Sequence, residues 1–385
     1  MKPTIGILTV TNQENGGIHQ YTLSLCEALN KYSTKFNFVQ IRTESFPVIF
    51  DRHILVDQSR SKSILKRTQK IVKLFTGLGP RNLSPIPDVV LNEIELIISP
   101  VISLMPFFAR KPYIVTIHDF QHMYYPEFFT ITERISRGIL YLTGKFANLV
   151  VVESNSVKED VIRFLKLTDE KIKILPSPPP SYISSRKLTD EVALKIKEKY
   201  SLPERYLFYP AQFWYHKNHI KLLEALSIIR EKFSVEIPLI LVGSKKNNFI
   251  NVMKKINDLR LQDLVRYLGY VSDEELPYLY KLAYALVVPT LFESVSIPIW
   301  EAFFIGTPVL CSNVCGLPEQ VGDAAILFDP NNAEEMADKI YLLWKNDELG
   351  YELSRKGKLR VENFTLERYA EEWESLIQMV LSTVR

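Results

Sequence analysis

The chain has 385 residues, 46% of them hydrophobic, which suits two globular domains and excludes a largely disordered chain. Its 47 basic and 44 acidic residues nearly cancel, so the strongly basic surface of a nucleic-acid-binding protein is not expected. The three cysteines, a small and odd number, indicate a reducing compartment such as the cytoplasm rather than a disulfide framework.

Short apolar stretches alternate with helical patterns from end to end, which is typical of open parallel α/β sheets. In the first half, strands are predicted at 5–10, 36–41, 96–98, 113–117, 149–152 and 172–175. In the second half, they are predicted at 206–209, 239–242, 265–268, 285–288, 309–311 and 325–328. The first segment lacks the long apolar region of a signal peptide, and no apolar run is long enough to span a bilayer. A soluble or peripheral protein is therefore expected.

Two features of the first half are candidates for ligand contact. Gly16 and Gly17 follow the first predicted strand, and glycines there let the backbone approach a ligand closely; a simple tight turn is the alternative. His118 ends the strand predicted at 113–117, where a histidine can hydrogen-bond a substrate or transfer a proton. The alternative for His118 is an orienting or internally satisfied side chain.

A basic stretch follows the second predicted strand. Residues 58–87 contain no Asp or Glu, and apolar side chains are interleaved with the basic ones. The basic residues are Arg60, Lys62, Lys66, Arg67, Lys70, Lys73 and Arg81. Such a segment, residues 60–81, can lie on an anionic membrane surface; a solvated helix or loop is the equal alternative.

The sequence Pro-Ser-Pro-Pro-Pro at 176–180 divides the two halves. Consecutive prolines cannot join a helix or a central strand, so this segment is an extended connector between domains at 1–180 and 181–365. A helix is predicted from about residue 366 to 384, within the C-terminal segment 366–385. Ligands of open α/β domains bind beyond the carboxyl ends of the strands.

Lys217 lies between the strand predicted at 206–209 and the following helix. A lysine there can place a positive charge on the phosphates of a transferring group; an ordinary surface lysine is the alternative. His216 and His219 flank it, but the neighbouring residues supply no further metal ligand, so no metal site is expected.

Glu293 and Glu301 frame the loop and helix start that follow the strand predicted at 285–288. Ser296 is a plausible N-cap, and Pro298 suits the first turn of the helix. The backbone amides of Ser294, Val295, Ser296 and Ile297 are expected to face an anion such as a diphosphate. Glu301 can accept hydrogen bonds from a ribose diol. The alternative is a loop glutamate plus a solvated helical glutamate, although the apolar neighbours of Glu301 indicate that its carboxylate needs a partner.

These motifs, in this order, resemble the family 4 glycosyltransferases. The resemblance is strongest from residue 206 to 330 and includes the Glu-x7-Glu pair, Gly306-Thr-Pro-Val309 and Pro318-Glu-Gln-Val-Gly-Asp323. It implies the GT-B fold: two facing Rossmann-like domains with a donor and acceptor cleft between them, and a final helix that crosses back to the first domain.

The resemblance also implies roles. Glu293 would face the donor sugar, amides of Val295 to Ile297 would hold the diphosphate, and Glu301 would bind the ribose. Lys217 would stabilise the leaving phosphates, His118 would lie against the transferred sugar, and the Gly16–Gly17 loop would approach both diphosphate and acceptor.

One departure weakens the expected diphosphate clamp, because Gln212 stands where many members have an arginine. The variants His216-Lys-Asn and Ser294-Val-Ser resemble the branch that builds bacterial surface polysaccharides. A retaining, front-face transfer of a hexose or deoxyhexose is expected, from a nucleotide diphosphate sugar to a saccharide or lipid-linked saccharide. No cofactor and no essential metal are expected, since no Asp-x-Asp motif stands at a strand end.

Two other functions remain open at this point. The first is a non-catalytic scaffold that binds the sugar nucleotide without transfer. The glutamine at position 212, in place of the usual arginine, is the reason to consider it. A nucleotide-sugar epimerase would turn over the donor without any acceptor. The base, the sugar, the acceptor and the linkage are not marked by any motif.

Overall fold

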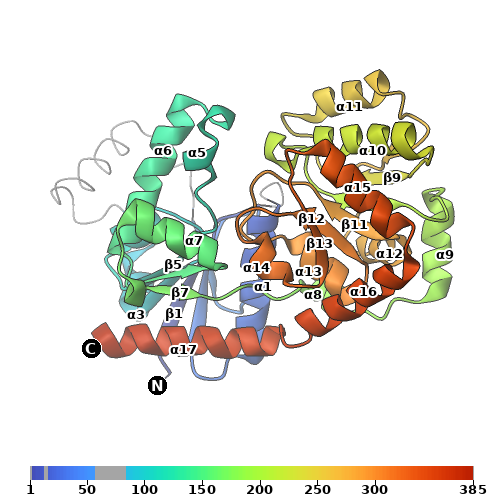
Figure 1. The fold of residues 1–385 in the computed structure, drawn as a ribbon. Helices are drawn as coiled ribbons and strands as arrows, with labels where there is room; N and C mark the ends of the chain where they lie inside the picture. Colours follow the sequence, from blue (N-terminus) through green and yellow to red (C-terminus); the bar gives the residue numbers. More distant parts are fainter. Residues whose placement is uncertain (1, 13–15, 57–83, 385) are drawn as a thin grey trace. The chain divides into compact units, whose positions relative to one another are not determined.

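The computed structural model describes residues 2–12, 16–56 and 84–384. The chain divides into two compact units, residues 1–177 with 366–385, and residues 178–365. The connector predicted at 176–180 contains this division, and the C-terminal helix belongs to the first unit (Figure 1).

The first unit is built on a seven-stranded parallel sheet of order β3-β2-β1-β4-β5-β6-β7. Its strands are β1 (Thr4–Thr9), β2 (Asn37–Arg42), β3 (His53–Leu55), β4 (Leu96–Ser99), β5 (Tyr113–Thr116), β6 (Leu149–Val152) and β7 (Ile172–Ile174). Its helices are α1 (Gly17–Tyr32), α3 (Asp88–Glu93), α4 (Met105–Ala109), α5 (Gln121–Tyr124), α6 (Ile131–Leu142), α7 (Asn155–Asp160) and α17 (Leu366–Val384).

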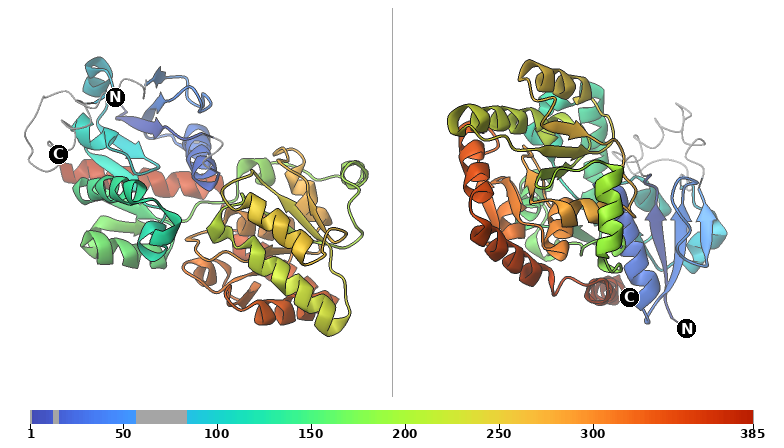
Figure 2. Two further views of the ribbon diagram at one scale, coloured as in Figure 1. Left: turned by 90° about the horizontal axis from the view of Figure 1, so that it is seen from above. Right: turned by 90° about the vertical axis from the view of Figure 1, so that its right-hand side faces the viewer.

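The central strands of this sheet are buried on both faces, as expected for parallel strands with helices on either side. Ile5 and Ile7 of β1 pack in the same cluster as Trp373 of α17, whereas Leu8 belongs to the cluster on the other face. The helix α17 packs along α1, and both lie on this unit in the two views of Figure 2. Its acidic residue Glu374 accepts hydrogen bonds from the Ser33 hydroxyl (2.6 Å) and from the next two backbone amides.

The second unit is built on a six-stranded parallel sheet of order β10-β9-β8-β11-β12-β13. Its strands are β8 (Leu207–Pro210), β9 (Leu239–Val242), β10 (Val265–Tyr267), β11 (Ala285–Val288), β12 (Val309–Ser312) and β13 (Ala325–Phe328). Its helices are α8 (Ser181–Ser184), α9 (Asp190–Lys199), α10 (His219–Phe233), α11 (Phe249–Asp258), α12 (Leu276–Leu282), α13 (Ile297–Ile305), α14 (Leu317–Val321), α15 (Ala333–Trp344) and α16 (Asp347–Val361).

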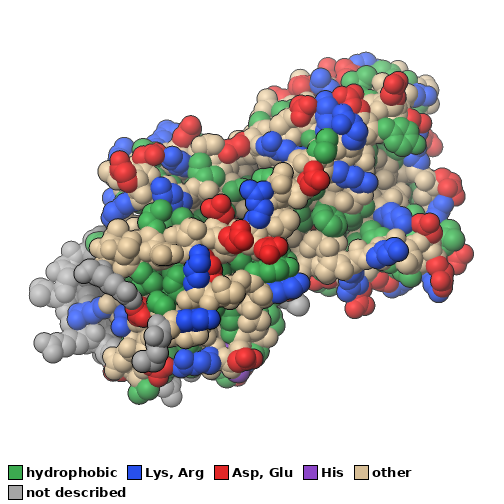
Figure 3. All heavy atoms as spheres, turned by 90° about the horizontal axis from the view of Figure 1, so that it is seen from below, with side chains coloured by type: hydrophobic (Ala, Val, Ile, Leu, Met, Phe, Trp, Pro, Cys, Tyr) green, Lys and Arg blue, Asp and Glu red, His purple; other side chains and the backbone are tan. Residues whose placement is uncertain are grey.

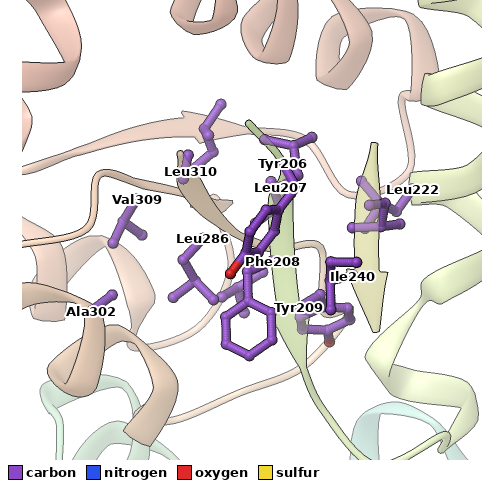
Figure 4. Close-up of a cluster of buried hydrophobic side chains, with 14 of the residues drawn as sticks. Tyr206, Leu207, Phe208, Tyr209, Leu222, Ile240, Leu286, Ala302, Val309 and Leu310 are labelled. Carbon is purple, nitrogen blue, oxygen red and sulfur yellow. The ribbon is translucent and has the colours of Figure 1, made fainter. Parts of the chain in front are cut away.

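The core of the second unit is continuous around its central strands. Phe208 of β8 and Leu286 of β11 pair in register and are fully buried, and Figure 4 shows both within a cluster of apolar side chains. Figure 3 shows acidic and basic side chains interspersed on one face of the described residues, in keeping with the near balance of charge. The α/β fold with two doubly wound parallel sheets is therefore confirmed. How the two units face one another stays a prediction.

Candidate functional site

The central feature of the second unit is the reversal of strand order between β8 and β11. β9 and β10 extend the sheet on one side of β8, while β12 and β13 extend it on the other side of β11. The chain leaves these two neighbouring strands in opposite directions, which opens a crevice at their carboxyl ends, the usual ligand position in open α/β sheets. The loops at 211–218 and 289–296 begin there, and they contain most of the predicted site residues.

Hydrogen bonds fix these two loops to each other. The backbone amide of Leu291 and the hydroxyl of Thr290 both donate to the carbonyl of His216, at 2.7 and 3.0 Å. The side-chain amide of Asn218 donates to the backbone carbonyls of Pro289 and Pro330, both at 2.9 Å. Asn218 has a φ of 56°, a left-handed conformation that asparagine tolerates better than most residues. These hydrogen bonds therefore hold the two loops together at the carboxyl ends of β8 and β11.

Lys217 and Glu293 are brought together across the crevice. The Lys217 ammonium donates to a carboxylate oxygen of Glu293, and the two side chains are 20% and 17% exposed. The Tyr209 hydroxyl donates to the carbonyl of Lys217 (2.9 Å), which holds the lysine backbone in place. An anion that enters the crevice can compete with Glu293 for the ammonium, because both side chains remain partly accessible.

The amino terminus of α13 lies at the end of the second loop. Ser296 is the N-cap residue, but its side chain makes no capping hydrogen bond. Instead, the Gln320 side chain accepts from the Ser296 amide and donates to the Ser296 carbonyl, both at 2.8 Å. The Ser296 amide is therefore not available to a phosphate in this conformation, contrary to expectation. Among the described residues, no acceptor is found for the amides of Ser294, Val295 and Ile297.

Glu301 lies one turn into α13 and is only 2% exposed. Its two carboxylate oxygens accept hydrogen bonds from the hydroxyls of Tyr182 and Tyr280. Burial raises the Glu301 pKa to about 7, and the two tyrosine hydrogen bonds act in the opposite direction. The expectation that this carboxylate needs a partner is confirmed. The two tyrosines were not predicted, because neither has a sequence spacing that relates it to Glu301.

Gln212 belongs to a tight turn after β8. Its side-chain oxygen accepts from the Trp214 indole N–H at 2.9 Å. Gly243, at the end of β9, lies so close to this turn that a Cβ there would be 2.3 Å from the Ala211 carbonyl oxygen. Gly243 also has a φ of 142°. Sequence reasoning missed this glycine, although its position directly after a predicted strand was a usable signal.

His118 lies at the carboxyl end of β5 in the first unit. Its Nδ1 is 3.0 Å from a Glu153 carboxylate oxygen, and its Nε2 is 2.9 Å from the carbonyl oxygen of Pro100. Burial alone would lower the His118 pKa, but the hydrogen bond and negative charge of Glu153 raise it above its ordinary value. Because both partners are acceptors, the ring satisfies them fully only as a doubly protonated imidazolium. These contacts favour the alternative of an orienting, internally satisfied histidine over a proton-transferring one.

The predicted glycine turn lies at the start of α1. Gly16 is the N-cap residue and has a φ of 56° with a ψ of −121°, a conformation that other residues rarely adopt. The strand order of the first sheet reverses between β1 and β4, so this turn follows a strand at the switch point of its unit. The predicted basic segment, residues 60–81, lies outside the described residues.

The second unit matches a known protein family in sequence. A family model described as glycosyl transferases group 1 matches residues 193–360. The chain is 29% identical over 256 residues to the O-antigen chain mannosyltransferase B of Escherichia coli, which covers 66% of this chain and 67% of that protein. It is 29% identical to the O-antigen chain mannosyltransferase RfbU of Salmonella typhimurium, over 59% of each chain.

The fold itself has solved counterparts. The structure of Anabaena Alr3699/HepE in complex with UDP and glucose aligns with a TM-score of 0.76 and 17% identity, over 98% of this chain and all of that one. This likeness extends across both units, so it shows that the fold of the chain is that of two Rossmann-like units. Among the described residues, no helix is both long and apolar enough to cross a membrane.

Proposed function

We propose that this chain, whose residues 193–360 match a family model of group 1 glycosyl transferases, transfers a hexose or deoxyhexose from a nucleotide diphosphate sugar to a saccharide or lipid-linked saccharide. We favour a mannosyl or rhamnosyl group, and the names of two relatives, both O-antigen mannosyltransferases, support the mannosyl type. The product would enter bacterial surface polysaccharide, with the enzyme in the cytoplasm. Association with the inner face of the membrane through residues 60–81 is part of this proposal.

The observation that supports this function best is the pairing of Lys217 with Glu293 beside the start of α13. The lysine and the amides of Ser294, Val295 and Ile297 supply positive potential at one place, which suits the diphosphate of the donor. Binding of the diphosphate would draw Lys217 away from Glu293. The freed carboxylate would then accept hydrogen bonds from the donor sugar.

The proposed chemistry retains the configuration of the anomeric carbon. The bond between this carbon and the diphosphate oxygen breaks, and a bond to the acceptor oxygen forms on the same face. The acceptor proton passes to the departing phosphate oxygen, so the products are a glycoside and a nucleoside diphosphate. The ammonium of Lys217 stabilises the charge that develops on the leaving group, and Glu293 orients the sugar.

We further propose that the reaction needs neither a cofactor nor a metal, because Lys217 and the helix terminus supply the positive charge that a metal provides in other transferases. Activity should survive exhaustive chelation, and a complete loss that Mg²⁺ restores would contradict this. Gln212 contributes no charge to the clamp; its side chain supports the turn after β8 instead.

The test starts with binding of GDP, UDP, TDP and ADP, followed by transfer from the matching sugar donors. Glu293→Ala should abolish transfer and leave nucleotide binding largely intact. Lys217→Ala should lower kcat about 100-fold or more, as loss of one transition-state donor does elsewhere, and Lys217→Arg should restore part of it. Lys232→Ala is the matched control, because Lys232 pairs with Asp338 on the surface at 2.7 Å.

Two outcomes would replace this function by another. Donor binding without transfer or hydrolysis, over a broad acceptor panel, would indicate a binding scaffold. Conversion of the donor sugar in the absence of any acceptor would indicate an epimerase.

A further inference from the structure

The connector between the two units leads directly into the helix that covers Glu301. Residues 178–180 are all proline, and Pro180 is the N-cap of α8, a helix of four residues. Tyr182, the second residue of this helix, donates its hydroxyl hydrogen to Oε1 of Glu301. The helix packs on α13, which contains Glu301.

The Glu301 carboxylate is therefore hydrogen-bonded on both oxygens and shielded from solvent. Tyr182 occupies one oxygen, Tyr280 occupies the other, and 2% of the residue is exposed. Because the residue is only 2% exposed, a ribose hydroxyl can reach these oxygens only where a side chain that covers them, such as one of the two tyrosines, moves aside.

The two tyrosines differ in how they are held. Tyr280 is fully buried on α12, and its ring packs edge-on against Phe208 in the core, with ring centroids 5.0 Å apart. Its backbone carbonyl also accepts from the Thr307 hydroxyl at 2.8 Å. Tyr182, in contrast, is part-buried on a single-turn helix. Movement of Tyr280 would open the core, whereas the Tyr182 side chain is partly exposed and belongs to a helix of a single turn, so its displacement leaves the core packed.

We propose that Tyr182 is a gating residue of the donor site, which the ribose of the incoming nucleotide displaces from Glu301. This inference rests on the proposed function, because it assigns the ribose to Glu301. A phenol and a sugar hydroxyl are equivalent donors to a carboxylate, so one replaces the other without leaving the buried oxygen unsatisfied. Tyr182 thus lowers the apparent affinity for the nucleotide, and it keeps Glu301 paired when no nucleotide is bound.

The test is the nucleotide affinity of Tyr182→Phe, measured by calorimetry with the nucleoside diphosphate that the wild-type chain binds best. The variant loses the competing hydroxyl, so at a pH above 7, where Glu301 is ionised, its Kd should fall about tenfold, the order expected for one hydrogen bond to a charged group. The 2′,3′-dideoxy form of the same nucleotide cannot replace Tyr182 at Glu301. The Kd of this dideoxy nucleotide should therefore be the same for Tyr182→Phe and the wild type.

Tyr280→Phe is the matched control, since it removes the hydroxyl from the other oxygen of the same carboxylate. It should not tighten nucleotide binding, because the Tyr280 ring stays in the core and its hydroxyl is not the one displaced. An unchanged or higher Kd for Tyr182→Phe would overturn the gating role while nucleotide binding by the wild type still supported the proposed function. If neither the wild type nor Tyr182→Phe bound any nucleoside diphosphate, the gating role and the proposed function would both be contradicted.

Discussion

Glu301 offers a direct test of the electrostatics of the second unit. Its pKa is raised from the usual 4.5 to about 7, chiefly by burial. The folded chain therefore holds a proton on this carboxyl over a pH range in which the unfolded chain has lost it. It follows that the contribution of Glu301 to stability falls as the pH rises from about 4.5 to about 7, and is constant outside this range.

The size of the effect follows from the same two pKa values. The difference between 4.5 and about 7, at 1.36 kcal/mol for each pKa unit, corresponds to about 3 kcal/mol. Glu301→Gln resembles the protonated carboxyl in shape and does not titrate. The wild-type chain should therefore lose about 3 kcal/mol of unfolding free energy relative to this variant between pH 4.5 and pH 7.

Urea unfolding followed by tryptophan fluorescence can measure this difference. In a Trp373→Phe background the remaining tryptophans are Trp214, Trp300 and Trp344, all in the second unit. The chain with Glu301 and the Glu301→Gln variant would both be unfolded at several pH values in this background. A difference in free energy that does not change with pH would refute the assignment of a raised pKa to Glu301. Tyr280→Phe removes a hydrogen bond that lowers this pKa, so it should extend the loss to higher pH.

Two further predictions concern the first unit. His118→Gln should lower the free energy of unfolding by about 3 kcal/mol at pH 6, because it leaves Glu153 buried without its cation. Since the pKa of His118 is raised, the cost should shrink as the pH rises through the folded value; a cost independent of pH would contradict the imidazolium. Glu374→Ala should cost about 1–3 kcal/mol and speed hydrogen exchange in α17, because it unpairs the Ser33 hydroxyl and the amides that follow. Exchange at the wild-type rate would show that α17 is held by its apolar contacts alone.

Much of the fold could be predicted from the sequence, because central parallel strands are buried on both faces and read as short apolar runs. Each predicted strand has an observed counterpart, within one or two residues at its ends. The strand β3, His53–Leu55, was missed because it is an edge strand of only three residues, of which His53 and Leu55 are exposed.

The site was predictable only where it depends on local sequence. The loops with Lys217 and Glu293 follow strands, so their placement at one sheet edge could be inferred from strand order. The hydrogen-bond partners of each side chain could not be inferred from the sequence. Pro100 and Glu153, which engage His118, come from other strand ends of the sheet, and no spacing relates them to it. Likewise, Gln320, which bonds the Ser296 backbone at the start of α13, lies 24 residues away in the sequence.

The proline connector has one more consequence. Near its start, the Ser177 hydroxyl donates to Glu153 (2.8 Å) in the first unit; just after its end, Tyr182 donates to Glu301 in the second. The residues between these two anchors include three consecutive prolines, whose rings fix φ near −65°. Such a segment has little slack to absorb a displacement. Release of either hydroxyl from its carboxylate therefore removes a restraint at one end of a segment whose own backbone is stiff.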